Sequence, residues 1–394
     1  MESNVAALDL RRGERLWLHR FNAGNPGPNG VALADGRLYG ATDTTAFALT
    51  LRTGRLVWQR RLLSRHESFV DTAPAVANGL VYLSTTGYAP GTRGAFYALD
   101  AARGTIRWRF DTIKLPWRYP LEAGGGGAWY PPSVDPDGRI YWGTANPIPW
   151  GGTRARPNGG SFPGPALYTD SLLVFDGSTG RLLWYDQVSP HDIRDHDFQL
   201  PPVLAGGRVI GAGKAGLVVA WDSRTQRRLW QTEVGLHRND RGPLPRRLVP
   251  VCPGLLGGVE TPLAVADDRV FVPVVDLCSR GSAVGFAPLE QTNPARGRGE
   301  LVALDVRDGR RIWTHRFAEP IFGCATVGDG VVFTSTYGGT VYGLDVRDGR
   351  VLWTARLQAR INACPALAER MLLVGAGVPR GRDSTLELVA FGTA

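Results

Sequence analysis

A short segment recurs seven times along the chain, and this repeat constrains the fold more than any other feature. Most copies have an apolar stretch ending in Asp, a polar turn with Gly, and a second stretch ending in Trp, as in ALDVRDGRRIW and GLDVRDGRVLW. The seven copies end at Trp17, Trp58, Trp108, Trp184, Trp230, Trp313 and Trp353. Such regular self-similarity is typical of repeat architectures, in which neighbouring units bury one another's apolar faces.

The repeat predicts four antiparallel strands per unit. The turn Gly suits a position with φ > 0, so each copy reads as two strands joined by a tight turn. A second strand pair precedes each copy, as in CATVGDGVVFTST. Four such strands make the blade of a β-propeller. We therefore predict an all-β propeller that occupies residues 1–394 as a single domain, in keeping with the 51 Gly and 28 Pro of its many turns.

The two ends of the sequence do not supply complete units. Residues 4–19 contain only the last two strands of a unit, and INACPALAERMLLVGAG with LELVAFG supplies three strands without a Trp strand. A ring closes when an N-terminal strand pairs with the last blade and so removes the exposed edge. We therefore expect eight blades with incomplete first and last ones, and a missing N-terminal segment that carries a signal peptide and about three strands. Seven blades with one strand left over is the alternative.

Two insertions interrupt the regular spacing, and they cover roughly residues 109–172 and 235–298. Insertions in repeat proteins fall in loops on one face, which is often the binding face. Residues 124–198 are the one stretch where aromatic, amide and acidic residues gather, in the segments GGGGAWY, TANPIPW and SPHDIRDHDF. We expect the functional site in this stretch.

The net charge of +9 does not indicate a nucleic-acid partner. The cations are scattered over turns and strand ends and are nearly all Arg, because Lys114 and Lys214 are the only lysines. Such a distribution is typical of a solvated surface and not of a basic patch. The sequence has no run of 18 apolar residues, so we predict no membrane span. Residues 1–17 have no apolar core of the kind that a signal peptide needs.

The four cysteines, Cys252, Cys278, Cys324 and Cys364, fit no zinc-binding spacing. They could form two disulfides or remain free thiols in the core. Cys324 and Cys364 occupy equivalent positions in successive units, and we expect these two to be buried thiols.

The repeated Asp-x-x-x-Gly-x-x-x-Trp unit resembles the tryptophan-docking motif of pyrroloquinoline quinone (PQQ) dehydrogenases, eight-bladed propellers that include methanol and ethanol dehydrogenases. The resemblance implies PQQ and a Ca²⁺ or lanthanide ion as cofactors, a small alcohol as substrate, and a cytochrome or quinone as electron acceptor. It also implies a periplasmic or secreted protein. Non-catalytic assembly proteins of the outer membrane carry similar blades, so a propeller that binds a protein or carbohydrate is the alternative.

Three segments extend the resemblance to residues of the expected site. GGGGAWYPPSVD is similar to the family's Gly-rich segment, which implies that Trp129 is the floor under the cofactor ring. GTANPIPW is similar to the segment whose Asn binds the metal, and this implies Asn146 as a ligand. SPHDIRDHDF resembles the segment that carries the catalytic base, which falls on Asp195, also a metal ligand here. Asp197 falls where lanthanide-using members have an extra acidic ligand.

The resemblance implies further roles elsewhere in the chain. GAGKAGLVVAWD places Lys214 at the quinone oxygens, and Thr86 is implied as another cofactor contact. Phe322 stands where a Trp usually meets the carboxylates of the cofactor. VCPGLLGG with VVDLCSRG resembles a disulfide pair of some members and implies a Cys252–Cys278 bridge.

These residue types suit the implied chemistry. Oxidising an alcohol by hydride transfer to a quinone needs a Lewis acid, a carboxylate to accept the hydroxyl proton and a flat surface for the ring. Amide and carboxylate oxygens are ligands that Ca²⁺ prefers, and an indole supplies a stacking face. The family's metal-binding Glu, however, corresponds to Ala89 in STTGYAPGTRGAFYALD, and the family's adjacent cysteine pair has no counterpart.

Overall fold

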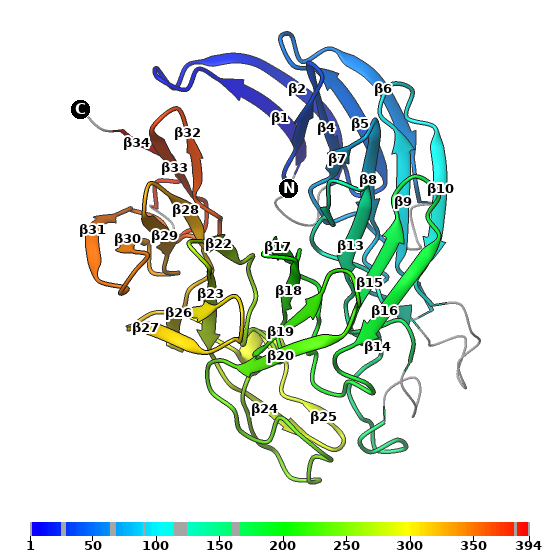
Figure 1. Cartoon of the computed structure of the whole chain (residues 1–394), viewed down its shortest axis with the longest axis vertical. Coiled ribbons are helices and arrows are strands. Elements are labelled where there is room, and N and C mark those ends of the chain that lie inside the picture. Colours follow the sequence, from blue (N-terminus) through cyan, green and yellow to red (C-terminus); the bar gives the residue numbers. More distant parts are fainter. Residues whose placement is uncertain are drawn as a thin grey trace. The chain divides into compact units, whose positions relative to one another are not determined.

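The computed structural model describes residues 2–24, 29–63, 68–89, 91–113, 124–159, 166–381 and 384–392. The first predicted insertion and the stretch 124–198 are therefore described only in part. The chain divides into two compact units, whose strands are labelled in Figure 1. Unit 1 comprises Met1–Trp150, Gly159–Ile193 and Asp197–Pro201, and unit 2 comprises Gly151–Asn158, Arg194–His196 and Pro202–Ala394.

Unit 1 is built from antiparallel sheets that follow one another along the chain. A two-stranded sheet is followed by three sheets of four strands. The strands are β1 (Glu2–Leu8) and β2 (Arg15–Gly24); β3 (Ala32–Ala34), β4 (Arg37–Ala41), β5 (Thr45–Thr50) and β6 (Leu56–Arg61); β7 (Ala75–Ala77), β8 (Leu80–Ser84), β9 (Ala95–Asp100) and β10 (Ile106–Asp111); and β12 (Ser133–Val134), β13 (Arg139–Gly143), β15 (Ser171–Asp176) and β16 (Leu182–Gln187). A small extra pair joins β11 (Gly124–Gly125) to β14 (Pro147–Ile148).

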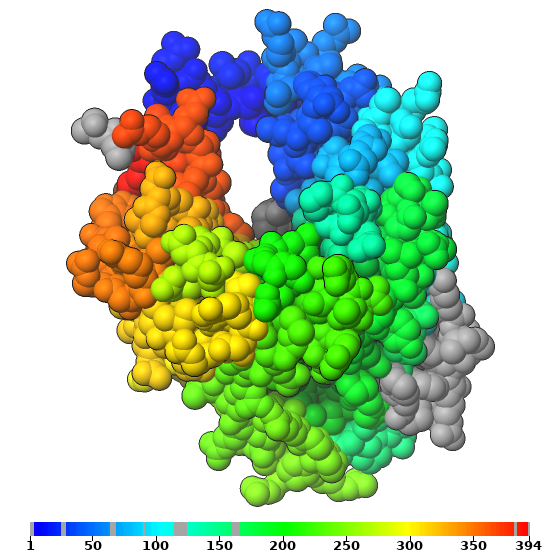
Figure 2. Space-filling model, viewed as in Figure 1, coloured from blue at the N-terminus to red at the C-terminus, as the bar shows by residue number. Residues whose placement is uncertain are grey.

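Unit 2 continues the series with three four-stranded sheets and a final sheet of three strands. The strands are β17 (Val203–Ala205), β18 (Arg208–Ala212), β19 (Leu217–Asp222) and β20 (Arg228–Glu233); β22 (Ala264–Ala266), β23 (Arg269–Asp276), β26 (Arg298–Asp305) and β27 (Arg311–Phe317); β28 (Thr326–Gly328), β29 (Val331–Ser335), β30 (Thr340–Asp345) and β31 (Val351–Arg356); and β32 (Ala366–Ala368), β33 (Met371–Ala376) and β34 (Glu387–Gly392). The insertion adds β21 (Val249–Val251), β24 (Ser279–Ser282) and β25 (Gly285–Phe286). Figure 2 shows part of it, in light green, as a lobe beyond the sheets of this unit.

The strand grouping expected from the repeat is confirmed. Among the described residues, six sheets have four strands, the first sheet has two and the last repeat sheet has three. The number of blades in the complete ring stays a prediction. The only helices among the described residues are two short 3₁₀ turns, η1 (Leu289–Gln291) and η2 (Pro294–Arg296). Neither is long and apolar enough to cross a membrane.

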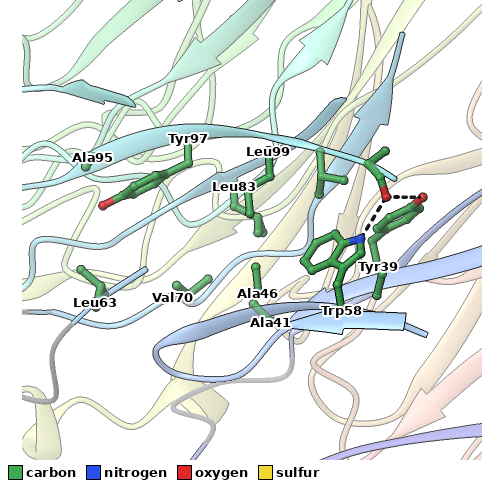
Figure 3. Close-up of a cluster of buried hydrophobic side chains, with 13 residues drawn as sticks. Tyr39, Ala41, Ala46, Trp58, Leu63, Val70, Leu83, Ala95, Tyr97 and Leu99 are labelled. Carbon is green, nitrogen blue, oxygen red and sulfur yellow. Dashed lines mark hydrogen bonds between the residues drawn. The ribbon is translucent and has the colours of Figure 1, made fainter. Parts of the chain in front are cut away.

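The repeat tryptophans fix successive sheets to one another. The indole N–H of Trp58 on β6 donates to the carbonyl oxygen of Ala101 at 3.0 Å (Figure 3). Its ring covers Gly104, where an added Cβ would lie 2.5 Å from the indole. Gly104 also has a φ of +68°, so the turn requires Gly for both reasons.

The core lies between neighbouring sheets. In unit 1, Tyr39, Leu83, Tyr97 and Leu99 from two sheets pack into one buried cluster (Figure 3). Val70 also belongs to this cluster and is fully buried. It comes from the segment before β7, which therefore runs along the core. Packing of this kind supplies most of the stability of a repeat protein, because each sheet buries the face of the next.

Both cysteine pairs form disulfides. The Cys252–Cys278 bridge implied by the resemblance is confirmed, with Cα atoms 4.5 Å apart. The expectation that Cys324 and Cys364 are buried thiols was wrong, because the structure joins them and Cys364 is exposed. The two residues lie just before β28 and β32, and their Cα atoms are 4.6 Å apart, within the range that a disulfide spans.

Candidate functional site

The Gly-rich segment that precedes Trp129 lies between two other segments of unit 1. On one side, the Gly125 N–H donates to the carbonyl oxygen of Gly87 at 2.9 Å. On the other, the Ala145 N–H donates to the carbonyl oxygen of Gly127 at 2.7 Å. A Cβ on Gly127 would clash with the carbonyl oxygen of Thr86, so only Gly lets the three segments approach this closely. The run of glycines thus places Trp129 and Asn146 on adjacent segments.

Trp129 lies in a group of three aromatic rings. Its ring centroid is 6.0 Å from that of Phe69 and 6.0 Å from that of Tyr88, both in edge-to-face geometry. Tyr88 is 58% exposed, so the group opens to solvent. Among the described residues, no aromatic ring stacks flat against Trp129. The arrangement is compatible with a planar ligand stacked on the indole.

The structure brings together two of the predicted metal ligands, Asn146 and Asp197. The backbone N–H of Asn146 donates to the carboxylate Oδ1 of Asp197 at 2.7 Å. The neighbouring Phe198 N–H donates to the carbonyl oxygen of Thr144 at 3.1 Å. Asn146 and Asp197 are 6% and 4% exposed. A buried amide and a buried carboxylate on adjacent segments offer hard oxygen atoms of the kind that Ca²⁺ and Mg²⁺ bind.

In unit 2, the predicted base Asp195 forms an ion pair with Lys214. Lys214 lies in the turn between β18 and β19. The Gly216 N–H closes this turn by donating to the carbonyl oxygen of Gly213 at 3.0 Å. The Nζ of Lys214 is 2.5 Å from Oδ2 of Asp195, and the two side chains are 7% and 21% exposed. Asp195 has a φ of +66°, a left-handed backbone region that Asn and Asp adopt more often than other residues except Gly.

The neighbours of Asp195 hold its segment in place. The Arg194 guanidinium donates to the carbonyl oxygens of Asn239 at 3.0 Å and Gly242 at 2.5 Å. The His196 ring Nε2 is 3.4 Å from the carbonyl oxygen of Pro253. Contacts of the two neighbouring residues thus fix the backbone of Asp195 on both sides.

The other predicted residues lie in one unit or the other. Thr86, in unit 1, is 2% exposed, and its hydroxyl is 3.1 Å from that of Ser68. Phe322, in unit 2, is half-buried, with its ring 5.5 Å from that of Tyr337. Ala89 is exposed in a turn that the Thr92 N–H closes by donating to its carbonyl oxygen. The predicted site residues are therefore grouped as Thr86, Trp129, Asn146 and Asp197 in unit 1, and Asp195, Lys214 and Phe322 in unit 2.

Sequence reasoning did not identify Phe69, a neighbour of Trp129, or Asp71, which follows Phe69 by two residues in the chain. Phe69 contacts the Trp129 ring, and Asp71, two residues later, is a half-buried carboxyl group whose pKa burial raises to about 6. Neither belongs to a repeat motif, so no sequence pattern distinguishes them. Within the described ranges, no three His, Cys, Asp or Glu side chains are already grouped as a metal site.

Comparison with known proteins identifies the class and the family. Solved structures of quinoprotein dehydrogenases share the fold, so the chain is a β-propeller of the PQQ-dehydrogenase type. A family model described as outer membrane protein assembly factor BamB matches residues 1–272 and 297–391. The chain belongs to this family of propellers with PQQ-like repeats.

The most informative relatives by sequence are alcohol dehydrogenases. The chain is 32% identical over 224 residues to quinohemoprotein alcohol dehydrogenase ADH IIB of Pseudomonas putida, covering 49% of this chain and 32% of that protein. It is 30% identical over 242 residues to quinohemoprotein alcohol dehydrogenase of Comamonas testosteroni, covering 53% and 34%. The match thus spans about a third of the length of these relatives.

The solved structures agree over nearly the whole chain. The Comamonas testosteroni enzyme superposes with a TM-score of 0.83 at 21% identity, covering 100% of this chain and 72% of that one. A europium-containing methanol dehydrogenase gives a TM-score of 0.78 at 20% identity, covering 95% and 79%. BamB from Moraxella catarrhalis gives 0.61 at 15% identity, covering 95% and 85%. At these identities the structural comparisons show the fold alone.

Proposed function

We propose that this chain is the propeller of a quinoprotein dehydrogenase, which binds PQQ with a Ca²⁺ or lanthanide ion and oxidises a small alcohol. The observation that carries the proposal is the ion pair of Asp195 and Lys214, held by a backbone with φ of +66° at Asp195. A partly buried carboxylate that is ion-paired and held by its neighbours supports a catalytic role. The alcohol dehydrogenases at 30% to 32% identity support the same reaction class.

Each side chain has a role that its surroundings support. Asn146 and Asp197 would hold the metal ion through the amide and carboxylate oxygens, and Trp129 would stack against the cofactor ring. PQQ, when bound, supplies the carbonyl that accepts a hydride. Asp195 accepts the hydroxyl proton of the alcohol, and Lys214 provides a positive charge at the same point. The donor set fits a hard cation, although Ala89 contributes no charge where the family has Glu.

The compartment and the electron acceptor are part of the proposal. Two disulfides favour an oxidising environment, such as the periplasm or the exterior of the cell. A relative at 28% identity is named 1-butanol dehydrogenase (cytochrome c). We propose a cytochrome or a quinone as the acceptor that reoxidises the cofactor.

Steady-state dye reduction tests this function. Purified protein incubated with PQQ and either CaCl₂ or LaCl₃ is expected to reduce an artificial acceptor when a short primary alcohol is added. Asp195→Asn should lower kcat by at least about a hundredfold while the circular dichroism spectrum stays unchanged. Asp137→Asn, an exposed turn residue of the same type, is the control and should keep full activity. Equal activity of the Asp195 variant would reject the assignment of the base.

Ala89 favours a second candidate function, that of a non-catalytic binding protein. Ala89 lacks the carboxylate of the family's metal site, so the chain could be a non-catalytic propeller that binds a protein or a carbohydrate. This alternative predicts that PQQ and metal ions produce no activity with any alcohol. Dye reduction that is lost in the Asp195 variant would exclude it.

A further inference from the structure

One segment of the second insertion, residues 252–259, reaches the turn that carries Lys214. At its end, the Val259 N–H donates to the carbonyl oxygen of Gly213 at 3.2 Å. Gly258 has a φ of +81°, and a Cβ added there would clash with the carbonyl oxygen of Lys214. Only Gly therefore lets the segment approach the Lys214 backbone this closely.

The start of the same segment is linked to Asp195 through the preceding residue, Arg194. Cys252 and Arg238 exchange two backbone hydrogen bonds, of 2.7 and 2.9 Å. Asn239, which follows Arg238, accepts the Arg194 guanidinium at its carbonyl oxygen at 3.0 Å. Arg194 is 6% exposed, so this contact is shielded from water. The backbone beside Asp195 is thus anchored to the part of the insertion that pairs with Cys252.

The segment makes a second contact beside Asp195, on the other side of this residue. The carbonyl oxygen of Pro253 lies 3.4 Å from the ring Nε2 of His196. Residues 252–259 therefore touch the neighbours of both members of the ion pair. A displacement of this one segment would change the position of Asp195 and of Lys214 relative to each other.

A disulfide and backbone pairing hold the segment in place. The Cys252–Cys278 bond ties its first residue to the chain that follows β23. Gly258 and Val275 exchange backbone hydrogen bonds of 2.9 and 2.8 Å. Because the segment is fixed at both of its ends, few other positions are open to it.

We propose that the Cys252–Cys278 disulfide positions the Asp195–Lys214 pair, by fixing residues 252–259 against both partners. The disulfide and Gly258 act through the ion pair and not by contact with a substrate or cofactor. The proposal rests on the function proposed above, because it gives the geometry of the pair a purpose in catalysis. The positioning itself can be measured on the protein without a cofactor.

Acetylation of the Lys214 amine by acetic anhydride measures this positioning, with mass spectrometry of the peptide that contains it. The wild type should react slowly, because the Lys214 side chain is paired and 7% exposed. Replacing both Cys252 and Cys278 with Ser should speed the reaction at least about tenfold, since local opening exposes the amine. The matched control replaces both Cys324 and Cys364 with Ser, which removes the other disulfide, and should react as the wild type does.

A second variant keeps the disulfide and moves the segment. Gly258→Ala places a methyl group against the Lys214 carbonyl oxygen and should also speed acetylation at least about tenfold. Gly207→Ala is its control, because Gly207 has a φ of +73° and an added Cβ there meets nothing within 4 Å. Only variants with the circular dichroism spectrum of the wild type are compared. A wild-type rate in Gly258→Ala, or equal acceleration in both glycine variants, would overturn the proposal.

Dye reduction by protein loaded with PQQ and Ca²⁺ or La³⁺ tests the consequence for catalysis. Gly258→Ala should lower kcat roughly tenfold or more with little change in KM, because the base is displaced while the substrate surface is kept. Full kcat in a Gly258→Ala protein with accelerated acetylation would overturn the catalytic purpose of the positioning. An inactive wild type would overturn the dehydrogenase function, and the acetylation rates would still decide whether the disulfide positions the pair.

Discussion

The Nζ of Lys214 lies 2.5 Å from Oδ2 of Asp195, and both side chains are largely withdrawn from solvent. One residue comes from a tight turn between β18 and β19, and the other from a segment with a left-handed backbone. Little water can reach the two charged groups here, so each charge is stabilised mainly by the other.

Removing one member of the pair should destabilise the protein. Lys214→Met leaves a carboxylate uncompensated, and we expect the free energy of unfolding to fall by about 3 kcal/mol. The double variant Asp195→Asn with Lys214→Met should cost less than the sum of the single variants, with a coupling of about 1 kcal/mol or more. Urea denaturation measures the free energy of unfolding of the wild type, the two single variants and the double variant. Additive losses would show that the two groups do not interact.

The docking of the repeat tryptophans predicts a difference between two glycines. Gly104 and Gly79 have φ values of +68° and +72°, but only Gly104 lies under an indole ring, that of Trp58. Gly79→Ala should cost about 1 kcal/mol through its backbone conformation alone. Gly104→Ala should cost roughly 1 to 3 kcal/mol more, because the new methyl displaces the Trp58 ring. Thermal unfolding of the two variants tests this prediction. Equal losses of stability would contradict the packing of the Trp58 ring over Gly104.

Acid should weaken the turn that follows β26. A side-chain hydrogen bond from Arg307 lowers the pKa of Asp305 from its ordinary value of 3.8 to about 2. Because the folded pKa is depressed, the stabilisation is present above about pH 4 and is lost as the pH falls toward 2. Arg307 is 70% exposed, so solvent screens the pair and the effect is modest.

The measurement for this turn is the melting temperature between about pH 5 and pH 2. Asp305→Asn should lose less stability than the wild type over this range. Asp329→Asn, an exposed turn residue with a φ of +49°, serves as the control and should follow the wild-type curve. If the wild type and Asp305→Asn gave parallel curves, the hydrogen bond would have no role in stability.

The sequence was sufficient to predict the parts of the structure that repeat. The Asp, the turn Gly and the Trp of the repeat recur in each unit, as Gly104 and Trp108 do, so the four-stranded sheets could be read from the pattern. The Cys252–Cys278 bridge was likewise implied by its flanking segments. Local turn chemistry and hydrophobic alternation carry this kind of information.

The contacts that depend on packing could not be predicted. Asp195 and Lys214 are 19 residues apart with a strand pair between them, and no local rule sets their distance. Phe69 belongs to no motif, and only the folded chain shows that its ring contacts that of Trp129. The Cys324–Cys364 bridge was not predicted, because equivalent positions in successive units do not reveal how closely the two Cα atoms approach.

The central claim, that this propeller holds a working quinone site with Asp195 as base, is tested most directly by a single-turnover experiment. Protein loaded with oxidised PQQ and Ca²⁺ or La³⁺ is mixed anaerobically with a short primary alcohol while the absorbance of the quinone is followed. We predict that the wild type converts PQQ to its reduced form in one exponential phase and that Asp195→Asn binds PQQ but reduces it at least about a hundredfold more slowly. Failure of the wild type to bind PQQ, or equal rates in the two proteins, would contradict the account.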